Sequence, residues 1–181
     1  MRIVGGRWRG LALDGLPGKD IRPTSDRARE ALFNILAHAP FVPVSLQGAH
    51  VLDLFCGTGA LGIEAVSRGA ASAILIDQDL TAARANLKKV KEPDLFHVIQ
   101  ADASKLPAAR RPVDIALLDP PYRKGLVGPA LFSLVSQGWL TSGSLAVVET
   151  AADEMLAPID GLTQLDSRRY GAAMLWFLER V

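Results

Sequence analysis

The chain has 181 residues, of which 49% are hydrophobic, and its formal net charge is +1. This length and composition suit one globular domain with a sizeable core and at most a small appendage. The near-zero charge argues against a chain that is basic throughout, and no apolar run is long enough to span a bilayer. One cysteine and three scattered histidines exclude an internal disulfide and a metal cluster. We therefore expect a cytoplasmic protein without a bound metal and without a membrane partner.

The basic side chains are concentrated near the N-terminus. Residues 1–30 hold seven basic and four acidic side chains, a net charge of +3, whereas the rest of the chain holds 13 basic and 15 acidic ones. A basic end on a near-neutral body indicates a phosphate-rich partner that touches one face. A solvated surface explains the same charges equally well.

The first 44 residues predict a small appendage. Residues 1–13 contain short β-prone pieces around two glycine turns and predict a hairpin or an extended arm. After a loop rich in Gly and Pro, apolar residues recur at helical spacing over residues 24–39. Thr24 or Ser25 can cap this helix at its N-terminus.

From about residue 45 the sequence alternates between apolar strands and amphipathic helices. We predict strands at 50–55, 71–77, 95–100, 113–118 and 144–150, helices at 59–69, 80–91 and 125–137, and a C-terminal hairpin around Tyr170–Gly171. Such an alternation builds a parallel sheet that helices cover on both faces. The predicted fold is α/β, with an appendage over residues 1–44 and a core domain over 45–181.

A glycine-rich turn follows the first strand of the core. Gly57, Gly59 and Gly62 match the pattern G-x-G-x-x-G and open a helix, and Asp77 lies 20 residues after Gly57, at the end of the next strand. Glycines let the backbone approach a ligand closely, and amides at a helix start favour an anion. That anion is either a pyrophosphate or an amino-acid carboxylate, so the motif alone also fits NAD.

The ends of the first three core strands each supply a carboxylate, from Asp53, Asp77 and Asp102. A carboxylate at Asp53 repels a pyrophosphate but suits an ammonium group, which favours S-adenosylmethionine. Asp53 and the glycine amides then share the methionine end, Asp77 accepts from the ribose hydroxyls, and Asp102 accepts from the adenine amino group. The candidate cofactor-binding residues are Asp53, Phe55, Gly57, Thr58, Gly59, Asp77, Gln78, Asp102, Ala103 and Asp119.

The fourth core strand ends in the sequence DPPY, residues 119–122. Asp119 and the carbonyl of Pro120 can accept both N–H groups of an exocyclic amine, which turns its delocalised lone pair toward a methyl donor. Pro120 and Pro121 stiffen the loop before the substrate arrives, and Tyr122 offers a ring for an unstacked base. These four residues are the candidate catalytic group, and the predicted reaction is methyl transfer to an exocyclic nitrogen.

Together these motifs resemble one family of methyltransferases. The segments MRIVGGRWRG, RPTSDRAREALFNIL, VLDLFCGTGALGIEAVSRGA, DPPYRKGL and GWL look like the RsmD family, bacterial enzymes that methylate a guanine N2 in 16S ribosomal RNA. The resemblance covers nearly the whole chain in the same order. It implies a class I methyltransferase fold, with a seven-stranded, mostly parallel sheet and a C-terminal antiparallel hairpin. It also implies S-adenosylmethionine as cofactor and the small ribosomal subunit as partner, and we expect a monomer.

The resemblance further implies that the N-terminal appendage helps to grip RNA. The candidate RNA-binding residues are Arg7, Arg9, Arg22, Arg27, Arg29, Arg123 and Lys124. The chain departs from the family after Arg9, where Leu11, Ala12 and Leu13 replace basic residues that are common there. It also departs at Cys56, where we expect Ala; we interpret this cysteine as a small loop residue and not as a nucleophile.

Three other functions fit parts of the sequence. An amino-methyltransferase that acts on DNA adenine or protein glutamine uses the same chemistry, but no separate target-recognition segment is visible. A nicotinamide dehydrogenase explains the glycine turn and Asp77, yet it leaves Asp53 and DPPY without a role. A non-catalytic RNA-binding protein has no need of an acid that positions an amine.

Overall fold

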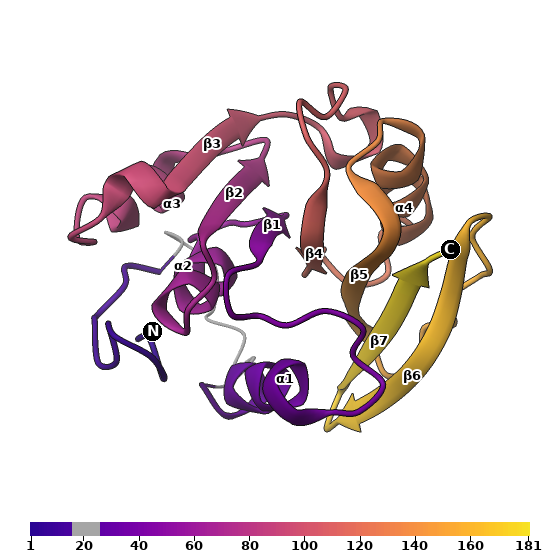
Figure 1. The fold of residues 1–181 in the computed structure, drawn as a ribbon, viewed down its shortest axis with the longest axis horizontal. Helices are drawn as coiled ribbons and strands as arrows, with labels where there is room; N and C mark the ends of the chain where they lie inside the picture. The colour runs from indigo at the N-terminus through magenta and orange to yellow at the C-terminus, as the bar shows by residue number, and fades with distance from the viewer. Residues whose placement is uncertain (16–25) are drawn as a thin grey trace.

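A computed structural model describes residues 1–15 and 26–181 of the chain, and Figure 1 shows a twisted sheet with helices packed on it. In chain order the elements are α1 (Asp26–His38), β1 (His50–Leu54), α2 (Ala60–Ser67), β2 (Ser72–Asp77), α3 (Thr81–Leu87), η1 (Pro93–Leu95), β3 (Phe96–Gln100), η2 (Ala103–Lys105), β4 (Val113–Leu118), α4 (Val127–Ser136), β5 (Leu140–Ala151), β6 (Leu162–Tyr170) and β7 (Ala173–Arg180). The predicted alternation of strands and helices is confirmed. The two candidate capping residues of α1, Thr24 and Ser25, lie outside the described residues.

The seven strands form one sheet in the order β3-β2-β1-β4-β5-β7-β6. Strands β1 to β5 pair in parallel, and β7 is antiparallel to both β5 and β6. This is the predicted mostly parallel sheet with a C-terminal hairpin. Because β1 and β4 are neighbours, the glycine turn after β1 and the DPPY loop after β4 lie at the same edge of the sheet. Open α/β sheets bind their ligands at such a switch in strand order.

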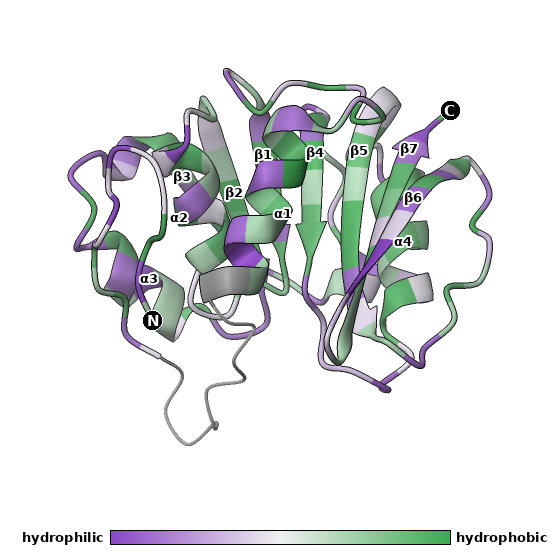
Figure 2. Cartoon of the chain, turned by 90° about the horizontal axis from the view of Figure 1, so that it is seen from below, coloured by the Kyte–Doolittle hydropathy of each residue, from purple (hydrophilic) through white to green (hydrophobic). Residues whose placement is uncertain are grey.

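Alternate side chains of the parallel strands pack into two core layers. Val51 and Leu75 belong to a buried cluster that also contains Phe33 of α1, whereas Leu52 and Ile76 belong to a second cluster with residues of α4. Figure 2 shows the strongly hydrophobic colouring of the central strands. Burial on both faces explains why these strands are apolar at most positions.

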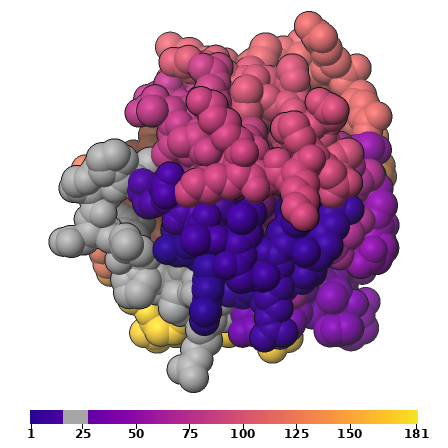
Figure 3. Space-filling view, turned by 90° about the vertical axis from the view of Figure 1, so that its left-hand side faces the viewer, coloured from indigo at the N-terminus to yellow at the C-terminus, as the bar shows by residue number. Residues whose placement is uncertain are grey.

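The N-terminal arm forms the predicted small hairpin, in which the Ile3 N–H donates to the Leu11 carbonyl at 2.9 Å. Figure 3 shows this arm against the segment that contains α3 and β3. Ile3 and Leu13 are buried in a third cluster with Ile63 of α2 and Val90. Burial gives a packing reason for Leu13, one of the apolar residues that follow Arg9.

The ends of the hairpin turn are anchored to α2. The Ser67 hydroxyl donates to the Gly5 carbonyl at 2.6 Å, and the Arg7 N–H donates to the Ser67 carbonyl at 2.8 Å. A Cβ at Gly6 would lie 1.9 Å from that same carbonyl oxygen, so only glycine fits there. None of the helices within the described ranges combines the length and hydropathy that a membrane crossing requires.

Candidate functional site

A cavity of about 690 Å³ lies at the carboxyl ends of the central strands, a volume typical of small-molecule sites. Its wall contains every candidate cofactor residue except Gly59, namely Asp53, Phe55, Gly57, Thr58, Asp77, Gln78, Asp102, Ala103 and Asp119. Gly59 instead stands at the N-cap of α2 with a φ of 77°, a conformation that favours glycine. Candidate residues predicted from the sequence at the ends of four strands therefore line the same cavity.

The glycine turn is tied to the carboxylates beside it. The Gly62 N–H donates to Asp53 Oδ2, and the Gly57 N–H donates to Asp77 Oδ2, each at 2.8 Å. The Gly59 N–H donates to the carbonyl of Cys56 at 2.7 Å. These hydrogen bonds fix the positions of the turn and of the two aspartates. That glycine amides of the turn hold the anionic end of a ligand stays a prediction.

Asp53 is a buried acid in an acidic neighbourhood. It is 1% exposed, and burial raises its pKa to about 8, helped by the charges of Asp119 and Asp77 and opposed by the Gly62 hydrogen bond. Near pH 7 this carboxyl is thus largely protonated, and a cationic group placed beside it would ionise it. The site is suited to a ligand that brings positive charge.

Hydrogen bonds and burial shift the pKa of two other residues of the wall, Asp102 and Cys56, in opposite directions. The exposed Asp102 accepts hydrogen bonds from the backbone N–H and the hydroxyl of Ser104, both at 2.8 Å, and these bonds lower its pKa. Burial and the nearby Asp53 and Asp77 raise the pKa of the Cys56 thiol. A protonated, buried thiol agrees with the interpretation of Cys56 as a structural loop residue.

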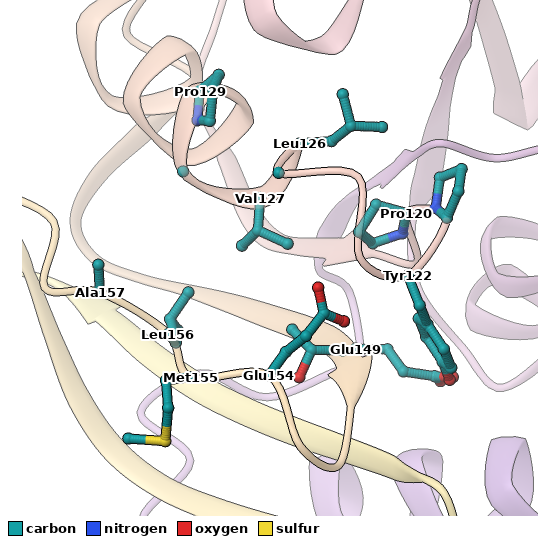
Figure 4. A pocket seen from close by; sticks show the side chains of 14 residues that line it. Pro120, Tyr122, Leu126, Val127, Pro129, Glu149, Glu154, Met155, Leu156 and Ala157 are labelled. Carbon is teal, nitrogen blue, oxygen red and sulfur yellow. The ribbon is translucent and has the colours of Figure 1, made fainter.

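A second, smaller cavity of about 190 Å³ adjoins the first at the DPPY loop. Pro120, Pro121 and Tyr122 line it together with the segment that follows β5, and Pro121 and Leu126 belong to the walls of both cavities. Figure 4 shows Pro120, Tyr122 and Glu149 around this space. The DPPY loop thus separates a large acidic cavity from a small one whose wall includes Tyr122.

Glu149 is a functional candidate that the sequence reasoning missed. It lies near the end of β5, is 8% exposed, and accepts a hydrogen bond from the Tyr122 hydroxyl. This bond joins the end of the DPPY loop to the neighbouring strand and fixes one end of the Tyr122 side chain. The available signal was a single acid in the otherwise apolar strand sequence LAVVE.

Arg29 corrects one of the predictions for RNA binding. It is 4% exposed and lines the larger cavity, so it does not belong to an outer RNA-facing surface. Its Nη2 donates to the Arg2 carbonyl, and its Nε lies 3.6 Å from Glu64 Oε2. The helical position of Arg29 on α1 turns it inward, toward the same face as the core residues.

The other basic candidates are placed differently from one another. Arg7 lies 3.1 Å from Glu92 and over the Trp8 ring, whereas Arg123 pairs with Asp153 at 2.8 Å. Arg9 and Lys124, the two remaining candidates among the described residues, are exposed. Arg22 and the side chain of Arg27 lie outside the described part of the structure.

Glu64 is a second residue that sequence reasoning missed. It is fully buried in α2, accepts the Val4 N–H at 2.8 Å, and lies 2.7 Å from the Nε of Arg68. Together with the Arg29 contact, these bonds connect the arm, α1 and α2. An acid inside the apolar helix sequence ALGIEAV was the only available signal.

Comparisons with known proteins agree with this fold. Residues 1–179 match the family described as Conserved hypothetical protein 95. Ribosomal RNA small subunit methyltransferase D of Escherichia coli K12 is 39% identical over 162 residues, which are 88% of this chain and 79% of the relative. The protein of the same name from Haemophilus influenzae is 34% identical over 178 residues, 94% of this chain and 89% of the relative.

A solved structure has a similar fold over nearly the whole chain. The structure of yhhF from Escherichia coli is 34% identical, has a TM-score of 0.83, and covers 99% of this chain and 97% of its own. The family match, the relatives and the fold extend over nearly the entire sequence. The chain therefore belongs to the Conserved hypothetical protein 95 family, which is the RsmD family of methyltransferases.

Proposed function

We propose that this protein transfers a methyl group from S-adenosylmethionine to the exocyclic N2 of a guanine in 16S rRNA of the small ribosomal subunit. One observation carries the proposal: the DPPY loop stands between two adjoining cavities. Asp119 lines the acidic cavity, and Tyr122 lines the smaller one. The relatives named as small subunit rRNA methyltransferases support the same reaction and the same class of substrate.

The larger cavity fits S-adenosylmethionine in charge and in donor chemistry. Its wall contains four aspartates, and the cofactor carries a cationic sulfonium and an ammonium group. Asp53 is the partner for the ammonium group, Asp77 accepts from the ribose hydroxyls, and Asp102 accepts from the adenine amino group. When bound, this cofactor supplies a methyl group that its positive sulfur makes electrophilic.

Residues of the DPPY loop prepare the acceptor nitrogen. The Asp119 carboxylate accepts one N–H of the guanine amino group, and the Pro120 carbonyl accepts the other. As the new N–C bond forms, positive charge develops on the nitrogen, and Asp119 stabilises that charge where it appears. The nitrogen then loses one proton, to Asp119 or to water. Tyr122, which Glu149 holds by its hydroxyl, supplies the surface on which the guanine ring stacks.

RNA contacts come from the N-terminal appendage and from the rim of the small cavity. The exposed Arg9 and Lys124 are the described candidates for phosphate contacts, with Arg7 and Arg123 beside them and Arg22 and Arg27 on the same appendage. We assign residues 1–44 to this appendage and 45–181 to the catalytic domain. The enzyme acts as a monomer in the cytoplasm, where its ribosomal substrate is found.

The experiment that tests this function is methyl transfer to small ribosomal subunits that lack the modification. Purified protein and labelled S-adenosylmethionine should label the 16S rRNA, and digestion to nucleosides should yield N2-methylguanosine. A subunit that already carries the modification is the matched control and should remain unlabelled. Label in ribosomal protein, in adenosine or in added DNA would replace this function with another amino-methylation.

A further inference from the structure

We propose that Arg29 binds the carboxylate at the methionine end of the cofactor, so that α1 and the N-terminal arm complete the cofactor site. The proposal rests on the proposed function, because it takes S-adenosylmethionine and its product S-adenosylhomocysteine as ligands of the larger cavity. Both molecules carry one carboxylate, and that group needs either a cation or N–H donors. The question is which groups of this chain provide them.

The first observation is the position of Arg29. Its side chain is almost fully buried, yet it lines the larger cavity. Its Nη2 bonds the carbonyl of Arg2, and the preceding Met1 accepts a weak bond from the Thr58 hydroxyl through its sulfur at 3.7 Å. The guanidinium therefore lies at the glycine-turn end of the cavity. The methionine end of the cofactor is assigned to this same end through Asp53.

The second observation is the hydrogen bonding of the glycine turn. A carboxylate at this place would ordinarily be held by amides of the turn. Here the N–H groups of Gly57 and Gly62 donate to Asp77 and Asp53, and that of Gly59 donates within the turn. These three glycine amides are already engaged, which favours a further donor for a ligand carboxylate beside the remaining amides of the turn. A guanidinium offers several N–H donors in a planar fork that matches a carboxylate.

The third observation is the distribution of charge around the cavity. Among the described residues that line it, Arg29 is the one Lys or Arg side chain, beside four aspartates. A carboxylate in the cavity would be repelled by the ionised aspartates of the wall. The α-amino group of Met1 is the rival cation, since Met1 also lines the cavity.

The surroundings of Arg29 hold its side chain in place before the ligand arrives. The buried Glu64 lies close to Arg29 Nε through Oε2 and pairs with Arg68 through Oε1. The Arg2 carbonyl accepts a hydrogen bond from Nη2 of the guanidinium. A buried, pre-positioned cation loses little side-chain freedom when it binds an anion, which favours affinity. The arm and α1 thereby act on the cofactor as well as on RNA.

The test combines a change in the protein with a change in the ligand. Calorimetry should measure binding of S-adenosylhomocysteine and of S-adenosyl-3-thiopropylamine, which keeps the ammonium group but lacks the carboxylate. Wild-type protein should prefer the carboxylate ligand by roughly 30-fold or more, as expected for a buried charge pair. Arg29→Met should remove most of that preference, with less than about a threefold change for the ligand without the carboxylate.

Arg68→Met is the matched control. Arg68 shares the Glu64 partner but does not line the cavity, so its loss should leave the preference between the two ligands unchanged. Two residues added before Met1 would move the α-amino group, and the preference should also survive this change. If it disappears, the α-amino group holds the carboxylate and the assignment to Arg29 is wrong.

The outcomes separate this proposal from the proposed function. Binding of neither ligand to the wild-type protein would overturn the cofactor assignment and the Arg29 proposal together. Equal affinity of the wild-type protein for both ligands would overturn only the Arg29 proposal. An equal loss for both ligands in Arg29→Met would show a purely structural role. If Arg29→Met does not fold, Arg29→Gln replaces it, because its amide can still donate to the Arg2 carbonyl.

Discussion

The two cavities on either side of the DPPY loop are built in different ways. Most of the larger one is formed by short segments that follow consecutive strands, which supply the carboxylates of Asp53, Asp77, Asp102 and Asp119, and the N-terminal segments add Met1, Gly15 and Arg29. The smaller one depends on contacts between distant segments, such as the bond from Tyr122 to Glu149 across 27 positions. A cavity made of strand ends can be recognised in a sequence, whereas one made of distant pairs cannot.

The largest expected effect is at the loop that the two cavities share. Asp119→Ala should lower the rate of methyl transfer by about 10²–10³-fold, because the preorganised acceptor of the amino group is lost. Binding of S-adenosylhomocysteine, measured by calorimetry, should change only a few-fold. Asp160→Ala, which removes an exposed carboxylate elsewhere, is the control. Normal turnover by Asp119→Ala would remove the catalytic role of this residue.

The next effect concerns the buried acid of the larger cavity. Asp53 has a pKa of about 8 in the folded protein and an ordinary value of 3.8. Between these two values the folded state holds more protons than the unfolded state, so stability falls as pH rises from about 4 to about 8. Asp53→Asn should be more stable than wild type at pH 9, on the order of a few kcal/mol, and nearly equal at pH 4.

Chemical denaturation without cofactor at pH 4 and pH 9 measures this difference. Asp102→Asn is the control from the same cavity, because hydrogen bonds lower its pKa in the folded protein. Since its shift has the opposite sign, this variant should show no gain in stability at pH 9. Equal stabilities of wild type and Asp53→Asn at pH 9 would mean that Asp53 is solvated or already compensated.

A third effect tests the packing beneath the glycine turn. A Cβ at Gly62 would lie 2.3 Å from Leu75 Cδ2, so Gly62→Ala should lower the free energy of unfolding by about 1–3 kcal/mol. Gly128 of α4 has no atom within 4 Å of the same added Cβ, and Gly128→Ala should be neutral or stabilising by up to about 1 kcal/mol. Urea denaturation of both variants makes the comparison, and equal changes would contradict the close approach of α2 to β2.

The differences between the two cavities explain which parts of the fold and of the site could be predicted from the sequence. Apolar strands buried on both faces, and glycines with defined spacing, are local signals, and they predicted the sheet, the turn and the acidic wall. Arg29 was misplaced because its basic charge suggested a surface, although its spacing from Leu32 and Leu36 places it on the buried face of α1. The contact of Arg29 with Glu64 and the packing of Leu13 in the arm depend on tertiary contacts that no local pattern encodes.

The smallest expected effect lies at the rim of the small cavity. Arg123 was predicted to contact RNA, yet its guanidinium makes two bonds to Asp153, at 2.8 and 2.9 Å. Both side chains are largely exposed, so the pair contributes little to stability. Its larger consequence is that Asp153 neutralises a cation beside the catalytic loop.

Asp153→Asn should therefore leave the free energy of unfolding nearly unchanged and strengthen binding to RNA. If the released charge of Arg123 gains one phosphate contact, the plot of log affinity against log salt concentration becomes steeper by roughly 0.7–0.9. Asp160→Asn makes the same change in net charge at another exposed site and should alter this slope much less. Equal slopes for the two variants would place Arg123 outside the RNA contact. A steeper slope for Asp153→Asn alone would show that electrostatics around the small cavity is set by pairs of distant residues.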